Sequence, residues 1–185
     1  MQIYTPLNIE KFFNNRGFTS KNDIAKGNLT LGNSSFPLDK FPLENPIIYK
    51  GIPFCFYHNL YGDNIELSGQ KITFPSLNSN KLHIIGNSSN GNLSDYIYIL
   101  NQNNIMSKVK IKLTCLTETT PFFNNECFWK FDYLHNPLEG SNINSGVLWY
   151  VSIDIKDVIN FDSFEFPDNP FIHIFAITVE SFIEK

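Results

Sequence analysis

The chain has 185 residues, of which 42% are hydrophobic, 15% aromatic and 17% charged, and its formal net charge is −4. This length suits one well-buried domain, so we predict a single domain over residues 1–185. The acidic balance argues against nucleic acid as a partner. No apolar run approaches about 18 residues, so we expect no transmembrane helix and no membrane partner.

The N-terminal residues and the cysteines bear on the compartment. Residues 1–8 lack a basic segment followed by an apolar one, so we expect a cytoplasmic protein, or an extracellular one if the sequence has been trimmed. Cys55, Cys115 and Cys127 form an odd set without C-x-x-C spacing. Reduced thiols are the expected state of such a set.

The first third of the chain reads as irregular. Residues 4–26 indicate an ordered entry loop with at most one helical turn. Prolines in residues 27–50 exclude a helix and predict extended chain. Strand signals then follow at 52–57, at 70–74, where Pro75 is expected to end the strand, and at 81–85.

A hairpin is predicted from two strand segments, 96–100 and 105–115, that flank Asn101-Gln-Asn-Asn104. In its second arm, apolar residues from Val109 to Cys115 alternate with lysines and Thr114. Such period-two alternation indicates one buried face and one solvated face.

Residues 116–145 are polar with an aromatic cluster, and we predict a long functional loop there. A strand at 146–155, a brief turn at 155–159 and a segment at 161–166 should follow. The final strand, 170–179, is apolar on both alternating faces, as is typical of a central strand covered on both sides.

Many short strands without a sustained 3.6-residue apolar period indicate the fold class. We predict an all-β protein, an antiparallel β-sandwich of jelly-roll or galactose-binding-like type.

Several motifs occur in an order that invites a comparison with a known family. They are Phe13-Asn-Asn-Arg-Gly17, Phe36-Pro37, Gly51-Ile-Pro-Phe54, Asp63-Asn64, Gly69-Gln70, Lys81-Leu-His-Ile-Ile-Gly86, Asn90-Gly91, Pro167-Asp-Asn-Pro170 and Ile172-His-Ile-Phe-Ala-Ile-Thr178. Through them the chain resembles the β-sandwich domain appended to bacterial glycoside hydrolases, including proteins labelled as fucosidases, and its free-standing relatives. The resemblance implies an accessory or carbohydrate-binding role and transfers no catalytic centre.

Two histidines share the pattern apolar-His-Ile and are the first candidate site. If Leu82, Ile84, Ile172, Ile174 and Ala176 face the sandwich core, then His83 and His173 lie on the opposite face with Phe175. We predict that this open face contacts a ligand, and His could there act as acid or base. The alternative is two structural histidines beneath covering loops.

Aromatic side chains able to stack on a sugar ring complete the predicted site: Tyr57, Tyr61, Trp129 and Trp149. Trp149 shares the apolar phase of its strand and is also a core candidate, whereas Trp129 falls in the 116–145 segment.

Neither a metal motif nor a paired-carboxylate signature is evident. We therefore predict no metal and no cofactor, with a structural Ca²⁺ as an alternative suggested by related sandwiches.

The leading functional hypothesis is a non-catalytic, carbohydrate-binding-like module that binds a small molecule or glycan through the open sheet face and the 116–145 loop. One alternative is a small enzyme of specialised metabolism or glycan processing, with His83 and His173 as acid and base in an aromatic cavity. Another is a protein–protein interaction domain, for which a homodimer is a possible form.

Overall fold

The computed structural model describes residues 2–42, 45–138 and 140–182. The chain is built mainly of antiparallel strands, which confirms the predicted all-β class. The strands are β1 (Gln2–Pro6), β2 (Phe18–Thr19), β3 (Phe36–Pro37), β4 (Ile47–Tyr49), β5 (Ile52–Phe54), β6 (Ile65–Ser68), β7 (Lys71–Ser88), β8 (Leu93–Asn101), β9 (Asn104–Leu113), β10 (Glu126–Phe131), β11 (Leu134–Asn136), β12 (Gly140–Ile143), β13 (Gly146–Glu165) and β14 (Asp168–Phe182). Short 3₁₀ turns are η1 (Glu10–Phe12), η2 (Ile24–Lys26) and η3 (Leu38–Lys40).

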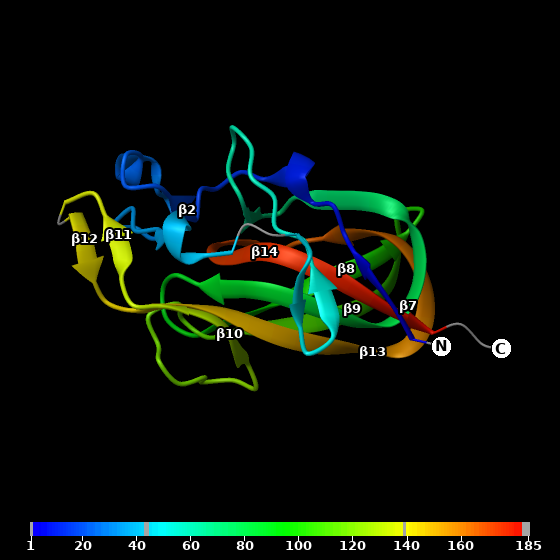
Figure 1. The fold of residues 1–185 in the computed structure, drawn as a ribbon. Coiled ribbons are helices and arrows are strands. Elements are labelled where there is room, and N and C mark those ends of the chain that lie inside the picture. Colours follow the sequence, from blue (N-terminus) through cyan, green and yellow to red (C-terminus); the bar gives the residue numbers. More distant parts are fainter. Residues whose placement is uncertain (1, 43–44, 139, 183–185) are drawn as a thin grey trace.

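The main sheet has the strand order β1-β14-β7-β13-β8-β9, with β10 added to β13 and β6 to β14. β7 and β13 are long enough to take part in both layers of the sandwich (Figure 1). Their pairing shifts register between Asp154 and Ile159. Beyond that point the two strands pair with each other, and β13 also pairs with β8. The start of β1 and the end of β14 lie at one end of the molecule and the β11–β12 hairpin at the other (Figure 1).

The first core fills the space between the two layers. The layer of β14, β7 and the start of β13 contributes side chains such as Ile84, Trp149 and Ile174, each at most 1% exposed. The β8–β9 layer contributes side chains such as Ile99 and Ile111, both fully buried.

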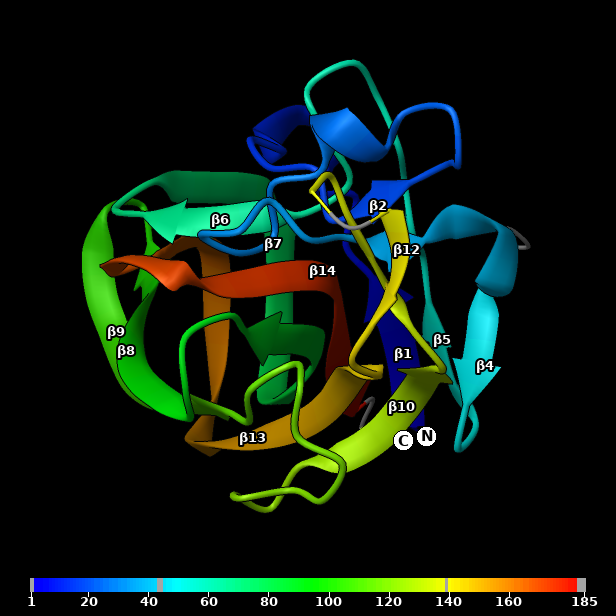
Figure 2. The ribbon, with the colours of Figure 1, turned by 90° about the vertical axis from the view of Figure 1, so that its left-hand side faces the viewer.

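A second core covers the other face of the β14–β7–β13 layer. It contains aromatic rings from irregular chain, among them Phe18, Phe36 and Phe54, packed with Phe131 and Phe175 from strands. β2 and the blue segments around it lie on one side of β14, and the β8–β9 hairpin lies on the other (Figure 2). We call the described residues 9–63 outside the main sheet the cover. Much of the aromatic surplus is therefore buried here.

The predicted hairpin is confirmed, since Asn101 pairs with Asn104 across a two-residue turn. Gln102 and Asn103 have φ values of 47° and 68°, as a type I′ turn requires. The final strand is also covered on both faces, and residues 172–180 are all buried.

Three local predictions, of a strand end, a turn and a long loop, are wrong. Pro75 does not end a strand, because β7 continues through it in a section with few ladder bonds to lose. No turn separates 155–159, where β13 passes through an irregularity. The 116–145 segment is not one long loop, since it contains β10, β11 and β12.

Among the described residues, no helix has the length and apolar character needed to cross a bilayer.

Removal of an aromatic ring from the second core should destabilise the whole domain. Phe131 is 1% exposed and stacks on Phe36 with ring centroids 4.5 Å apart. Phe131→Ala should lower the free energy of unfolding by about 3–5 kcal/mol, because a large cavity remains. Urea unfolding followed by circular dichroism measures this. Phe122→Ala is the control, since Phe122 is 69% exposed and should change stability by about 0.5 kcal/mol or less. Equal effects of the two substitutions would contradict the second core.

Candidate functional site

The polar residues of the family-like motifs meet where the cover joins β14. The Asp63 carboxylate accepts hydrogen bonds from the Gly17 and Phe18 amides at 2.8 and 3.0 Å. The Asn64 side chain donates to the Asn15 carbonyl at 3.2 Å and to Asp63 at 3.0 Å. We call Asn15, Gly17, Asp63, Asn64 and His173 the polar seam.

His173 is the sheet-side member of the polar seam and is 1% exposed. Nδ1 lies 3.2 Å from the Asn64 amide oxygen and Nε2 lies 3.2 Å from the Ser89 hydroxyl. Burial lowers the pKa of His173 to about 3, so the ring is neutral near pH 7. A neutral ring donates through Nδ1 and accepts from Ser89 through Nε2.

Ser89 also borders a surface hollow of 380 Å³ that Glu66 and Phe171 line. Burial raises the pKa of the Glu66 carboxyl, and a hydrogen bond from Asn15 opposes that rise. His173 itself does not line this hollow, so a ligand there would contact Ser89 first.

His83 belongs to a separate buried hydrogen-bond network. Its Nε2 lies 2.8 Å from Glu180 and its Nδ1 lies 2.8 Å from the Tyr150 hydroxyl. Burial lowers the pKa of His83 against the opposing effect of Glu180, and burial raises the pKa of Tyr150 to about 12. The Tyr4 ring covers His83 edge-on at 5.7 Å.

The two histidines share one sheet face, as their phase predicts, but the expectation that this face is open is wrong. His83 is 3% exposed and His173 is 1% exposed, because the second core and the cover lie on this face. Their recorded partners also differ, since His83 contacts Tyr150 and Glu180 whereas His173 contacts Asn64 and Ser89. They therefore do not form a joint acid–base pair.

Because of a bulge in β14, the prediction that Ala176 faces the core with Ile172 and Ile174 is wrong. Ile172 and Ile174 lie in the first core as expected, but Ala176 lies in the second core beside Phe175. The β14–β7 register shifts between Ile174 and Ala176, and an extra residue moves the following side chains to the other face. Phe175 is fully buried, so it fills the core instead of contacting solvent.

The other predicted aromatics occupy different parts of the fold. Trp149 is 1% exposed and donates its indole N–H to the Cys115 carbonyl at 3.1 Å. Trp129 lies on β10, where its indole N–H donates to the Lys40 carbonyl at 2.9 Å and its ring meets Phe41. Tyr61 is 77% exposed at a loop tip. Tyr57 is half-buried and borders a small cavity in the cover.

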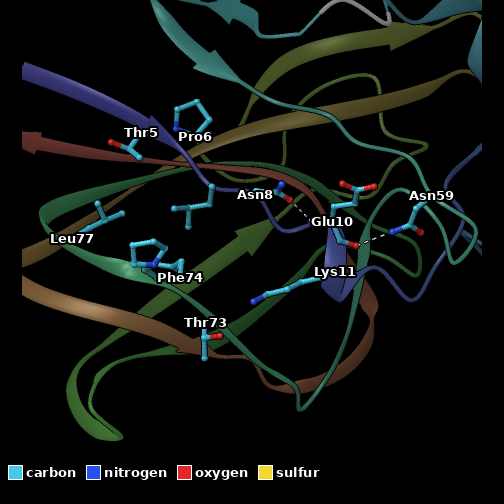
Figure 3. Close-up of a pocket in the computed structure, with 11 residues that line it drawn as sticks. Thr5, Pro6, Asn8, Glu10, Lys11, Asn59, Thr73, Phe74 and Leu77 are labelled. Carbon is cyan, nitrogen blue, oxygen red and sulfur yellow. Dashed lines mark hydrogen bonds between the residues drawn. The ribbon is translucent and has the colours of Figure 1, made fainter.

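A larger hollow lies elsewhere, between η1, the end of β1 and the start of β7 (Figure 3). This cleft has a volume of 760 Å³. Its lining residues are Thr5, Pro6, Leu7, Asn8, Glu10, Lys11, Asn59, Thr73, Phe74, Pro75 and Leu77. No sequence pattern predicts this cleft, because η1 and β7 are far apart in the chain.

The two sides of the cleft differ in chemistry. On the η1 side, the Asn8 side chain accepts from the Glu10 amide at 3.0 Å and Asn59 donates to the Glu10 carbonyl at 2.9 Å (Figure 3). These bonds use the Glu10 backbone and leave its carboxylate for other contacts. On the β7 side, the Phe74 ring is held against Phe164, with centroids 4.9 Å apart.

Among the described residues, His, Cys, Asp and Glu side chains do not gather in threes in an arrangement that could bind a metal ion. The cysteines at 55, 115 and 127 are free thiols in the structure.

The fold and the two-sided packing define this protein as a β-sandwich domain. A family model for the AziU2-like beta-sandwich domain matches residues 3–182, so the chain belongs to that family. No curated protein matches the chain.

The buried histidines should make stability depend on pH. Burial lowers the pKa of His83, His135 and His173, so the unfolded chain binds protons below about pH 6.5 that the folded chain does not. The free energy of unfolding should therefore fall as the pH drops from 6.5 to 5, by up to about 1.4 kcal/mol per pH unit for each histidine. Urea titrations at several pH values measure the slope.

The variant His173→Gln should have a shallower slope than the unaltered protein, whatever its stability at pH 7. Phe122→Leu is the control, because Phe122 is 69% exposed and its side chain does not titrate. An unchanged slope in His173→Gln would show that the His173 ring is not held neutral by burial.

Proposed function

We propose that this domain is a non-catalytic recognition module that binds a carbohydrate-like ligand in the cleft between η1 and β7. The observation that carries the proposal is the division of this cleft into a polar side and an aromatic side (Figure 3). A sugar ring presents hydroxyl groups at its edge and C–H groups on its faces. The cleft offers partners for both.

The polar side supplies groups that suit hydroxyls. Glu10 brings a carboxylate and Asn8 an amide, and Lys11 extends from η1 into the space beside them (Figure 3). The Asn59 amide holds the Glu10 carbonyl and accepts from the Tyr61 and Gly62 amides, so it supports this side of the cleft. These residue types both donate and accept hydrogen bonds, as recognition of a polyhydroxyl ligand requires. Lys11 is exposed, so it can turn toward a ligand.

The β7 side supplies an apolar floor. Phe74 is half-buried and its ring is fixed against Phe161 and Phe164, which lie below it in the first core. A ring that is already fixed loses little conformational entropy when a ligand stacks on it. Pro75 and Leu77 extend the apolar surface.

Recognition fits this cleft better than hydrolysis does. Glycoside hydrolysis ordinarily uses two carboxyl groups that flank the scissile bond. Among the described residues that line the cleft, Glu10 alone carries a carboxylate. The resemblance to domains appended to glycoside hydrolases supports the same choice, because that resemblance implies an accessory role.

Calorimetric titration with cellohexaose, xylohexaose, mannohexaose and chitohexaose tests the proposal. At least one should bind, and Phe74→Leu should weaken that binding by about tenfold, because leucine keeps the apolar volume but removes the ring face. Lys11→Met should weaken it by a similar factor through the loss of a charged donor.

Phe122→Leu is the matched control, since Phe122 is exposed and does not line the cleft. Its affinity should equal that of the unaltered protein. The proposal fails if none of the four oligosaccharides binds. It also fails if binding is indifferent to both cleft substitutions.

A further inference from the structure

A second, smaller cavity lies within the cover, apart from the cleft, and shares no lining residue with it. Its volume is 200 Å³, below the range of about 300–1,000 Å³ for pockets that hold drug-sized ligands. Its walls include four aromatic rings, and two ionisable side chains reach it: Phe18, Phe41, Phe56, Tyr57, His58 and Asp63.

Three of these aromatic rings, those of Phe18, Phe41 and Phe56, pack against one another and form the aromatic wall of the cavity. Phe41 lies between its neighbours, with its centroid 4.9 Å from that of Phe18 and 4.8 Å from that of Phe56. Phe56 and Phe41 meet edge to face, with 67° between their planes, so rings in different orientations border the same space. The electron-rich faces of such rings attract a cation.

The Asp63 carboxylate is the polar end of the cavity and is 3% exposed. All of its close hydrogen-bond donors are uncharged: the Gly17 and Phe18 amides and the Asn64 side chain. Among the described residues, the recorded ion-pair partner of Asp63 is His58, whose Nδ1 is 3.7 Å from Oδ2 and whose side chain is 48% exposed. A buried carboxylate with this surrounding favours a positive charge nearby.

The hydrogen bonds at Asp63 restrict the kind of cation. Oδ1 already accepts from Gly17 and Asn64, and Oδ2 accepts from Phe18, so about one of the four lone-pair directions of the carboxylate is free. A primary ammonium brings three N–H donors, which an aromatic cavity cannot satisfy. A methylated ammonium brings few or none.

We propose that this cavity binds a small methylated ammonium ligand, with the cationic head against Asp63 and the aromatic rings. The charge interacts with the carboxylate and the ring faces, while the methyl groups fill apolar space. The formal net charge of −4 also favours the approach of a cation. This site differs from the cleft in place and in ligand chemistry, so either proposal can fail without the other.

Titration with choline and with 3,3-dimethylbutan-1-ol tests the charge requirement on the full chain. The alcohol has the shape of choline but carries no charge. Choline should bind at least about tenfold more tightly than the alcohol, because the alcohol loses the attraction to Asp63 and to the rings. Equal affinities would overturn the proposal, as would the absence of choline binding at about 20 mM.

Two variants place the binding in this cavity. Asp63→Asn should lower choline affinity by about tenfold or more, through loss of the negative charge. Because Asp63 also supports the polar seam, Phe56→Leu is a second test that leaves the carboxylate in place. It should weaken choline binding by about fivefold while the affinity for the neutral alcohol changes little.

Phe122→Leu is the matched control, because Phe122 is 69% exposed and does not line this cavity. Choline affinity should be kept in this variant. Choline binding that is unchanged in Phe56→Leu would overturn the assignment to this cavity, even if Asp63→Asn fails to fold.

Discussion

The layer formed by β14, the second half of β7 and the start of β13 is apolar on both faces, and this constraint shapes the rest of the structure. Ile172 and Ile174 point to one side and Phe175 and Ala176 to the other, all at most 1% exposed. A sheet of this kind needs a cover on each face. The β8–β9 layer packs on one face. The other face is packed by the cover, which is largely irregular chain that carries aromatic rings (Figure 2).

An irregular cover buries backbone groups that no strand ladder satisfies, and side chains must supply their partners. Asp63 does this for the Gly17 and Phe18 amides, and Asn64 does it for the Asn15 carbonyl. His173 ties the same group of residues to β14. The polar motifs that carry the family resemblance therefore hold the cover on the sheet, which explains why they are buried.

The sequence is most informative where local pattern and tertiary environment agree. The alternation around Ile111 and the Asn-rich turn at 101–104 are local signals, and both predict the observed hairpin. The bulge at Phe175 has no such signal, and it alone decides that Ala176 faces the second core. The alternation of residues along the two strands predicts that His83 and His173 share a face. Whether that face is open to solvent depends on segments that are distant in the chain. Composition likewise reports many aromatics without saying which are buried.

The difference between the regular sheets and the irregular cover explains where hollows remain in the structure. The sheet faces are filled by the two cores, so the predicted histidines and Trp149 have neighbours in place of ligands. Hollows remain where irregular chain meets a strand or packs on itself, because side chains on loops pack less regularly than side chains on paired strands. The cleft beside η1 and the cavity next to Asp63 are gaps of these two kinds. The β-sandwich thus holds the rings and carboxylates of the cover in position, and the cover supplies Glu10, Lys11 and Asn59 to the cleft and Asp63 to the cavity.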